Sequence, residues 1–593
     1  MRSGKTYSLL VALIVSASFC GPSPAEPLEL LWSTFLGGSG DDYGYSVAVD
    51  DSGWVYVAGQ SLSTDFPAAE KGSRLICAER NDAFLAKLSS SGQVLRYLTI
   101  VGGDEPDAAT GVAADVYGNA YLTGWTGSSN FPVTPGAFDA ALDGDQDAFL
   151  ARLNASGSIL EYATYLGGEG KEEGTAIAVD QARRASLTGT TDSPDFPVSA
   201  SAYDTSHNGG QDVFATQFTD WGGALEFSTL IGGSGDETGR GIAVDQGGNV
   251  YLTGVTDSPD YPTSMAAYDT SYRGGLFGDA FVTKVHLTGS VLSYSTFLGG
   301  QGSDLGQDIA LERDKSAVVM GFTDSPDFPA TAGALDTSYN GGGYDLFLAR
   351  LNPWAQELSW STFLGGSGEE YGYGLALDPD DRPFVAGFTR SSDFPVTADA
   401  FSTERSGAFD LFVTRLDYDA GGLLFSTYLG AGEDDYVYGH CIAADDSGNA
   451  YLTGYTLSAD FPTTPDALDT IHGGGFDALL ARIGPAGSTP VADRDVPVSQ
   501  PPDPRLAQNA PNPFNASTEI HYQLSRDADV SLRIYNVAGQ MVRTLVNARQ
   551  PAGFHATIWD GTDDSRRAAA SGIYFCRLEA GREAETIKMV LVR

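Results

Sequence analysis

Short apolar segments alternate with glycine-containing turns along most of the chain, and residues 241–297 show the pattern most clearly. Residues 241–245 and 250–254 are apolar, β-branched runs on either side of a turn, which predicts two antiparallel strands. After a long loop, residues 280–285 alternate apolar and polar side chains as a third strand, and 291–297 form a fourth. No helical periodicity lies between them, so the pattern predicts a sheet of four antiparallel strands.

This unit recurs with a period of 65–67 residues. A glycine pair marks each copy, at 37–38, 102–103, 167–168, 232–233, 299–300 and 365–366, and Gly430-Ala431 marks a degraded seventh copy. A unit that cannot bury its own apolar face must stack on copies of itself, so this period predicts a solenoid or a propeller. Four strands per copy favour the blades of a β-propeller.

The two ends of the repeat region predict a closed ring. Residues 30–35 have the sequence of a fourth strand without the three strands that should precede it. The last copy ends with its third strand at 477–483. The N-terminal strand can therefore complete the last blade, which leaves no open sheet edge. We expect an all-β, seven-bladed β-propeller over 28–487, with four antiparallel strands per blade and the ring closed by the N-terminal strand. An open solenoid is the alternative.

A different unit follows the repeats. Residues 488–508 are rich in proline and predict an extended linker. Short alternating segments in 509–593 predict a small Ig-like β-sandwich. The charge changes as well, because 28–487 contains 64 acidic and 20 basic residues, against 9 and 10 in 509–593. The acidity therefore belongs to the repeat region.

The N-terminus has the layout of a secretory signal peptide, residues 1–25. Arg2 and Lys5 give a positive start, an apolar stretch follows, and Ala25 ends a small-residue cleavage motif. We therefore expect an exported protein, located outside the cell or on its outer surface. A lipid anchor at Cys20 and an uncleaved anchor are the alternatives. No later segment has the roughly 18 apolar residues that a membrane span needs, so none is expected in the mature chain.

The overall charge limits the classes of partner that are expected. The chain has 77 acidic and 34 basic residues and a net charge of −43. Such a chain repels the phosphates of nucleic acids, so nucleic acid is not an expected partner. It remains compatible with cations, with neutral polymers and with other envelope proteins.

No catalytic constellation stands out. The histidines, at 207, 286, 440, 472, 521 and 555, show no close metal-binding spacing. The Gly-Gly-Ser-Gly turns are not nucleophile elbows, because an acid occupies the position of the final glycine. The sequence therefore predicts a protein without catalytic residues and without a firmly assigned cofactor. An extracellular polysaccharide hydrolase or lyase is the alternative.

Acidic residues recur at two fixed places in every copy. One set ends the first strand: Asp50, Asp115, Asp180, Asp245, Glu312, Asp378 and Asp445. The other precedes the third strand: Asp82, Asp147, Asp212, Asp279, Asp345, Asp410 and Asp477. Equivalent use in all copies favours a structural role, in which the side chains accept backbone N–H bonds in tight turns. A functional site would more often break the symmetry.

Calcium is the alternative for part of this acidic set. Asp143, Asp145 and Asp147 stand at alternate positions and offer the oxygen ligands that Ca²⁺ prefers. The spacing is not that of an EF-hand, because Ala148 and Asn154 occupy the positions of its glycine and its final glutamate. These three aspartates are the candidate metal site, with Ca²⁺ as the candidate ion.

Aromatic residues in the loops are candidates for a second kind of site. They could stack on sugar rings at a propeller face, or they could pack between blades, which is the commoner role. These residues are Trp125, Tyr203, Tyr268, Tyr272, Tyr339 and Tyr344.

The repeat region resembles a known family. Segments such as 249–254 and 295–300 match the SBBP β-propeller repeats found in exported bacterial proteins, and the resemblance covers 28–487. It implies a scaffold and no particular activity.

The tail carries a second resemblance. Through 509–515, 535–540, 559–561 and 571–574 it resembles the FlgD-type Ig-like domain and the type IX secretion C-terminal sorting domain. This resemblance implies either recognition by an export apparatus or an assembly role.

These observations together predict an exported binding and adhesion platform. Its expected partners are glycans or envelope proteins, and the export machinery through the C-terminal unit. A passive spacer without a specific ligand is the alternative. Near-identical blades would favour the spacer, whereas one divergent, aromatic-rich face would favour binding.

Overall fold

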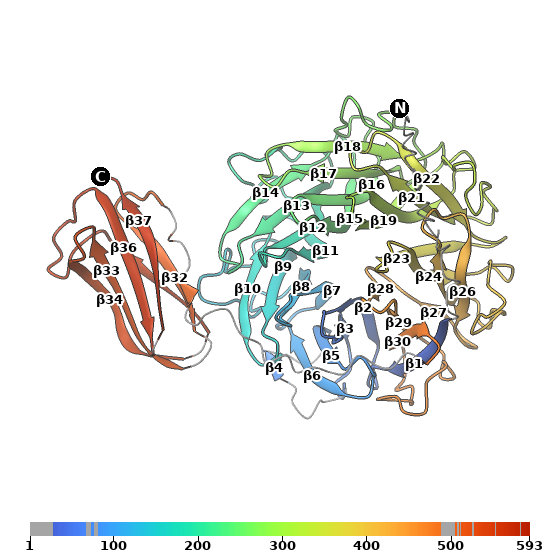
Figure 1. Cartoon of the computed structure of the whole chain (residues 1–593), viewed down its shortest axis with the longest axis horizontal. Coiled ribbons are helices and arrows are strands. Elements are labelled where there is room, and N and C mark those ends of the chain that lie inside the picture. The colour runs from blue at the N-terminus through green and yellow to red at the C-terminus, as the bar shows by residue number, and fades with distance from the viewer. Residues whose placement is uncertain are drawn as a thin grey trace, which may run out of the picture.

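The computed structural model describes residues 28–66, 73–75, 81–487, 505–506, 509, 512–524, 527–551, 553–581 and 583–593. The predicted signal peptide and most of the predicted linker lie outside the described residues. All regular elements in the described residues are β-strands, which confirms the all-β prediction, and this part of the chain contains no helix that could cross a membrane. Figure 1 shows a disc of sheets arranged around a common centre, and a smaller elongated unit at the C-terminus.

Six repeats fold into sheets of four antiparallel strands, and each of these sheets is named after its innermost strand. The sheet formed from both ends of the repeat region is named after β29 (Ala450–Thr456). The first three are β2 (Asp42–Val49), β3 (Val55–Ser61), β5 (Asp82–Leu88) and β6 (Leu95–Val101); β7 (Asp107–Ala114), β8 (Ala120–Thr126), β9 (Asp147–Leu153) and β10 (Leu160–Leu166); and β11 (Glu172–Val179), β12 (Ala185–Thr191), β13 (Asp212–Phe218) and β14 (Leu225–Ile231). The next three are β15 (Glu237–Val244), β16 (Val250–Thr256), β17 (Asp279–Val285) and β18 (Leu292–Leu298); β19 (Asp304–Leu311), β20 (Ala317–Thr323), β21 (Asp345–Leu351) and β22 (Leu358–Leu364); and β23 (Glu370–Leu377), β24 (Pro383–Thr389), β25 (Asp410–Leu416) and β26 (Leu423–Leu429). A short β4 (Ser73–Leu75) pairs parallel with β6.

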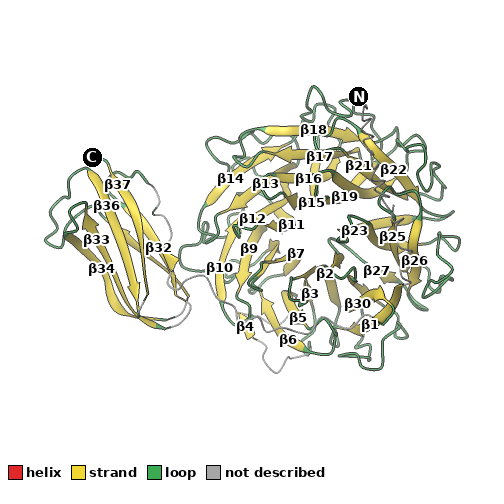
Figure 2. Ribbon diagram, viewed as in Figure 1, coloured by secondary structure: helices red, strands yellow, loops and turns green. Residues whose placement is uncertain are grey.

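The β29 sheet takes its strands from both ends of the repeat region. It contains β27 (Asp435–Tyr436), β28 (Ile442–Ala444), β29 (Ala450–Thr456), β30 (Asp477–Pro485) and β1 (Leu28–Phe35). β1 pairs antiparallel with β30, from Leu28 opposite Pro485 to Phe35 opposite Leu479. The strand β28 contacts both β23 and β2, so the β29 sheet lies between the β23 and β2 sheets (Figure 2).

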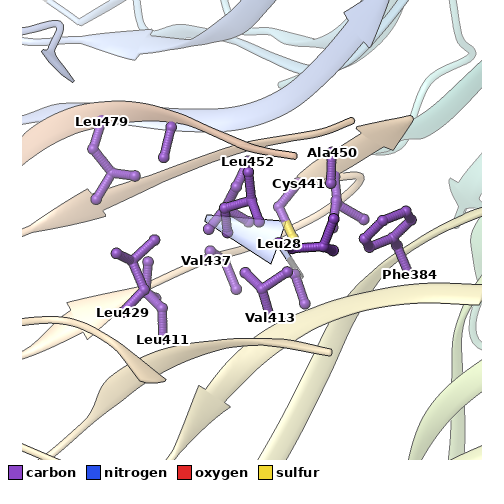
Figure 3. Close-up of a cluster of buried hydrophobic side chains, with 14 of the residues drawn as sticks. Leu28, Phe384, Leu411, Val413, Leu429, Val437, Cys441, Ala450, Leu452 and Leu479 are labelled. Atoms are coloured by element: carbon purple, nitrogen blue, oxygen red, sulfur yellow. The ribbon is translucent and has the colours of Figure 1, made fainter. Parts of the chain in front are cut away.

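Apolar side chains of neighbouring sheets interlock to form the core. Figure 3 shows one such cluster, in which Leu28 of β1 lies among Phe384, Val413 and Leu452 from the β23 and β29 sheets. The side chain of Leu28 is 2% exposed. Burial of a leucine contributes roughly 1.5–3 kcal/mol. The strand β1 is therefore an integral part of this core.

Each uninterrupted innermost strand carries a β-bulge near its start. In β2 the pairing moves from Gly44 directly to Ser46, so Tyr45 is the extra residue. The same shift makes Thr110, Thr175, Arg240, Gln307 and Tyr373 the extra residues of the other sheets. A bulge re-aims the extra side chain and increases the local twist. In the β29 sheet, residues 437–441 replace the bulge and separate β27 from β28.

The strands of the fourth repeat are longer than predicted at one end. The strand β15 begins at Glu237, whereas the sequence predicted a start at residue 241. The missed residues include Glu237, Thr238 and Arg240, which are polar and carry no strand signal of their own. They belong to the strand because the pairing with β16 already begins at Glu237 opposite Thr256, and Arg240 is the bulge residue within that paired stretch.

The C-terminal unit consists of two sheets around one core. One contains β31 (Arg505–Leu506), β32 (Thr518–Leu524) and β35 (Gly553–Trp559); the other contains β34 (Met541–Gln550), β33 (Ala528–Asn536), β36 (Gly572–Ala580) and β37 (Glu583–Leu591). Two strands were not predicted. The strand β34 has no buried position and shows no clear alternation. The strand β31 lies inside the predicted linker, and its Leu506 is buried in the core. His521 of β32 stacks on Trp221 of the β13–β14 turn, with ring centroids 4.4 Å apart.

Candidate functional site

Aromatic side chains gather on one side of the disc, where the innermost strands begin and the second strands end. Three positions of each repeat meet there: the second residue of the innermost strand, its cross-strand partner, and the residue before the third strand. In the β19, β23, β29 and β2 sheets, these positions and the nearby bulge positions hold Tyr43, Tyr45, Phe322, Tyr344, Tyr371, Tyr373, Phe388, Phe409, Tyr436, Tyr438, Tyr455 and Phe476. This set is named the aromatic crescent.

The rings of the crescent contact one another across all four sheets. The contacts between sheets have centroid separations of 5.2 Å for Phe322–Tyr371, 5.2 Å for Phe388–Tyr436 and 5.0 Å for Tyr455–Tyr43. Aromatic pairs of this kind contribute about 0.5–1.5 kcal/mol beyond the area that they bury. Most members are half-buried, and Tyr438 is 39% exposed. The rings are therefore fixed by their neighbours while part of each remains accessible.

The other sheets use the same positions differently. Their residues there are Ala108, Trp125 and Gln146 in the β7 sheet, Glu173, Thr190 and Gln211 in the β11 sheet, and Thr238, Val255 and Gly278 in the β15 sheet. Tyr371 pairs with Phe388 in the same register as Glu173 with Thr190. The difference therefore lies in the side chains and not in the strand pairing. The crescent breaks the symmetry of the repeats, as expected of a functional site.

Acidic groups border the crescent, and several of its phenols have raised pKa values. Tyr436 donates a hydrogen bond to Asp434 Oδ2 over 3.1 Å, and Asp41 Oδ1 accepts the N–H of Phe476 over 2.9 Å. Burial and the hydrogen bond to Asp434 raise the pKa of Tyr436 to about 12. Burial and the Asp41 charge also raise the pKa of Tyr43. The surface thus offers ring faces, neutral hydroxyls and carboxylates.

Residues 437–441 of the β29 sheet form a second departure from symmetry. His440 Nδ1 lies 3.0 Å from Asp308 Oδ1 of β19, and its Nε2 lies 3.3 Å from the carbonyl oxygen of Arg240 in β15. The backbone oxygen of His440 accepts the N–H of Val47 in β2 over 3.0 Å. This segment therefore connects the β29 sheet to strands of three other sheets.

The environment of His440 favours its charged form. Burial alone would lower the pKa of His440, but the Asp308 carboxylate and the Arg240 carbonyl raise it above its ordinary value. Asp308 is held in turn by the N–H of Leu375, 2.8 Å from its Oδ2. Burial raises the pKa of the neighbouring Cys441 thiol well above its usual range, so this thiol is not an activated nucleophile. The contacts are those of a structural ion pair.

Most of the acids that end the first strands act in the turns as predicted. Asp245 Oδ1 accepts the N–H groups of Gly247 and Asn249 over 2.8 and 3.1 Å. Some of them also face a basic side chain of the third strand, as Arg152 Nη2 does at 3.7 Å from Asp115 Oδ2. The predicted turn role is confirmed for six of the seven acids, namely Asp50, Asp115, Asp180, Asp245, Asp378 and Asp445. In the β19 sheet Asp314 accepts the turn N–H of Ser316, and Glu312 accepts hydrogen bonds from Arg350 instead.

The three candidate calcium residues lie in different environments. Asp147 begins β9 and is buried, and its Oδ2 accepts the N–H of Asp143 over 3.3 Å. Asp143 and Asp145 lie exposed on the loop before β9. Within the described ranges, no group of three or more acidic, histidine or cysteine side chains could hold a metal ion. The calcium site stays a prediction.

Of the loop aromatics singled out in the sequence, Tyr344 belongs to the crescent. Tyr272 and Tyr339 instead contact Phe297 and Phe363 of their own sheets, at 5.9 and 6.4 Å. The other crescent residues were not predicted from the sequence. The predicted candidates were aromatic residues of the loops, whereas most crescent residues lie in or beside strands. A comparison of equivalent positions across the repeats would have found them.

Two family models match parts of the chain. The beta-propeller repeat model, SBBP, matches 31–67, 96–132, 226–262 and 424–462. The FlgD Ig-like domain model matches 510–583. The chain therefore contains SBBP repeats and a C-terminal FlgD Ig-like domain, as the two resemblances implied. No curated protein matches the chain significantly.

Several solved structures are distantly similar. PorZ, a surface component of the type-IX secretion system of Porphyromonas gingivalis, gives a TM-score of 0.36 at 11% identity, and the match covers 94% of this chain and 60% of PorZ. A protein of unknown function from Dyadobacter fermentans gives 0.37 at 12% identity, over 77% and 99% of the two chains. The quinohemoprotein alcohol dehydrogenase of Pseudomonas putida gives 0.34 at 11%, over 78% and 77%. Similarity at this level carries no functional argument.

Proposed function

We propose that this protein is an exported, non-enzymatic binding platform at the outer cell surface, whose ligand lies on the aromatic crescent. In this proposal the disc is a closed seven-bladed propeller, supported by the pairing of β1 with β30 and by the contact of β28 with β2. The observation that carries the proposal is the confinement of the crescent to four neighbouring sheets. Stacking requirements shared by all repeats do not account for rings that only some repeats possess.

Glycans are the proposed ligand class. A sugar ring presents an apolar face that packs against an aromatic ring, and its hydroxyls can bond to tyrosine hydroxyls and carboxylates. The crescent supplies both kinds of partner, since Tyr436 and Asp434 lie side by side at its edge. Its rings are already held by one another, so little side-chain freedom is lost on binding.

The test is retention of the full-length mature chain on a panel of polysaccharides and envelope extracts, in Ca²⁺ and in EDTA. Tyr371→Ala and Tyr43→Ala each remove one half-buried ring of the crescent. Trp125→Ala is the matched control, because Trp125 occupies the position of Phe388 in a sheet outside the crescent. We expect each crescent variant to bind about tenfold more weakly or worse, and the control to bind normally.

The other outcomes separate the alternatives. Equal weakening by the control would contradict the crescent as the site, and no retention on any material would favour a passive spacer. Release of new sugar ends would identify a hydrolase or lyase. Retention that requires Ca²⁺ and is lost in Asp143→Asn would support the calcium prediction.

For delivery, we propose that residues 1–25 direct export and that the C-terminal unit serves as a sorting or attachment module. The FlgD Ig-like match supports a module of this size but does not distinguish type IX sorting from assembly. Deletion of 509–593 should abolish display on the cell surface, as measured by protease accessibility in intact cells. Unchanged display would contradict sorting and leave the assembly role.

A further inference from the structure

Two buried carboxyl groups meet at each junction between neighbouring sheets, beside the first glycine of the Gly-Gly pair. One belongs to the first residue of an innermost strand, and the other to the first residue of the third strand in the preceding sheet. A methyl group placed on Gly365 would lie 2.6 Å from Glu370 Oε2 and 2.9 Å from Asp345 Oδ1. The two oxygens therefore face the same small space, and glycine leaves room for both.

This arrangement recurs around the disc. The pairs are Asp477–Asp42, Asp82–Asp107, Asp147–Glu172, Asp212–Glu237, Asp279–Asp304, Asp345–Glu370 and Asp410–Asp435. Every member is at most 5% exposed. The third-strand acids were predicted as a repeated set, but their partners were not. The first residue of the innermost strand is aspartate in some repeats and glutamate in others, so it did not stand out as a repeated residue.

In five of the pairs, the third-strand acid uses only one oxygen for hydrogen bonding within the described part of the chain. Asp345 Oδ2 accepts the N–H of Asn340 over 2.5 Å, whereas its buried Oδ1 has no hydrogen-bond partner among the described residues. The Oδ1 atoms of Asp147, Asp212, Asp279 and Asp477 are in the same situation. Across the space, Glu370 Oε2 accepts the N–H of Gly366 over 2.9 Å. Two facing carboxylate oxygens repel each other in a buried site, unless a proton or a metal ion lies between them.

The surroundings of the Asp345–Glu370 pair favour a proton over a metal ion. Ca²⁺ takes about 6–8 oxygen ligands. The groups bonded to this pair are donors instead, namely the N–H of Asn340, the N–H of Gly366, the hydroxyl of Thr389 at 2.6 Å and the hydroxyl of Ser391. The further charges that act on the pair are those of Asp336 and Asp393, both acids. Additional negative charge makes the protonated form more favourable.

We propose that each carboxyl pair whose third-strand acid has such an unpartnered Oδ1 binds one proton near neutral pH, shared between the third-strand acid and the innermost-strand acid, and that this proton holds neighbouring sheets together. The Asp147–Glu172 pair has the same form, with Asp139, Asp143 and Asp192 as the neighbouring charges. Burial, and to a smaller extent the facing acid, raises the pKa of Asp345 and of Asp147 to about 7 in each case.

The direction of the pH effect follows from these pKa values. An aspartate in the unfolded chain has a pKa of about 3.9, well below the folded value. The stabilisation is therefore complete below about pH 4 and is lost as the pH rises through about 7. The urea midpoint of the full-length chain should be higher at pH 5 than at pH 8.

The test replaces the shared proton by a permanent donor. In the double variant Asp147→Asn/Asp345→Asn, the amide NH₂ can donate to the facing glutamate at every pH, while the amide oxygen keeps the loop N–H bond. We expect the difference in urea midpoint between pH 5 and pH 8 to be smaller than in the wild type. We also expect the infrared band of protonated carboxyl groups at pH 6 to be weaker in the variant.

Asp410→Asn is the matched control. Asp410 Oδ1 accepts the N–H of Gly407 over 2.7 Å, so an amide nitrogen there would face another donor and lower the midpoint at both pH values. A double variant with the same pH dependence as the wild type would overturn the proposal. It would also be overturned if Ca²⁺ raised the wild-type midpoint at pH 8 and the double variant lost this effect, because the space would then hold a metal ion.

Discussion

Replacing Gly365 by alanine tests directly whether two carboxyl groups occupy the space beside the glycine pair. The φ angle of Gly365 is not positive, so the backbone conformation is open to any residue. Only space forbids the side chain, since the new methyl group would lie 2.6 Å from Glu370 Oε2. Real Cβ atoms do not approach other atoms so closely, and Glu370 must therefore move.

The cost of that movement can be worked from the contacts. Glu370 would weaken its hydrogen bonds to the N–H of Gly366 and the hydroxyl of Thr389, which are 2.9 and 2.6 Å long. A hydrogen bond to a charged group contributes about 1.5–3 kcal/mol, and forcing a group into a packed site costs about 1–3 kcal/mol. The lower entropy of the unfolded chain with alanine offsets about 0.4–1 kcal/mol. We expect a net loss of about 2–4 kcal/mol in the free energy of unfolding.

The assay is urea denaturation of the full-length chain, with the slope checked against the wild type so that a midpoint shift reports stability. Gly432→Ala is the matched control, because a methyl group there would lie 3.7 Å from the Asp460 carboxylate and the φ angle is again not positive. The control should leave stability unchanged or raise it by up to about 1 kcal/mol, because alanine lowers the entropy of the unfolded chain without a clash. If Gly365→Ala behaves like the control, the carboxyl groups do not converge on this glycine.

Three further predictions concern other contacts. Arg152→Met should lower the free energy of unfolding by about 3–5 kcal/mol in urea denaturation, because it leaves the Glu161 carboxylate, 2.8 Å from Arg152 Nε in the wild type, without its positive partner; a loss below about 1 kcal/mol would contradict this. Asp308→Asn removes the group that raises the pKa of His440, so it should lower the free energy of unfolding by about 1–3 kcal/mol at pH 5.5 and by less at pH 8.5, because this stabilisation is lost as the pH rises through the raised pKa; an equal loss at both pH values would exclude the charged pair. Trp221→Ala removes the stacking contact with His521, so small-angle scattering should show the C-terminal unit farther from the disc; an unchanged radius of gyration would show that this contact does not hold the unit.

Local sequence signals were sufficient for the sheets but not for the site. Strand pairs such as β15–β16 are neighbours in the chain, and alternation and a short turn specify them. The strands β1 and β30 are far apart in the sequence, but their pairing was predicted. The repeat region begins with a fourth strand that has no preceding three, and its last copy ends with a third strand. The crescent depends on which residues face each other across strands and between sheets. Tyr371 meets Phe322 of the preceding sheet only after the strands have paired and the sheets have stacked.

The glycine pairs show a different limit of sequence reasoning. Their spacing predicted turns, and turns are present, but the conformational freedom of glycine is not the reason for the first residue of each pair. The reason is the room needed by two acids from neighbouring sheets, at Gly365 those of Asp345 and Glu370. The second acid of each pair interchanges between aspartate and glutamate, so it did not stand out as a repeated residue.

Symmetry separates structural residues from functional ones in this chain. In stacked repeats, stability is roughly a sum of repeat and neighbour-interface terms, so a residue needed for stacking is needed in every copy. The carboxyl pairs meet that condition and the crescent does not.

The β29 sheet also has the degraded glycine pair, and there Gly432 N lies 3.4 Å from Asp460 Oδ1, whereas the equivalent Ser367 N lies 2.9 Å from its aspartate. Weaker turn bonds and the extra segment 437–441 thus occur within the crescent, where the repeat pattern is least preserved. Departures from the repeat that cluster at one place, and that weaken its bonding, are not required for stacking, and they support the proposal that a ligand binds there.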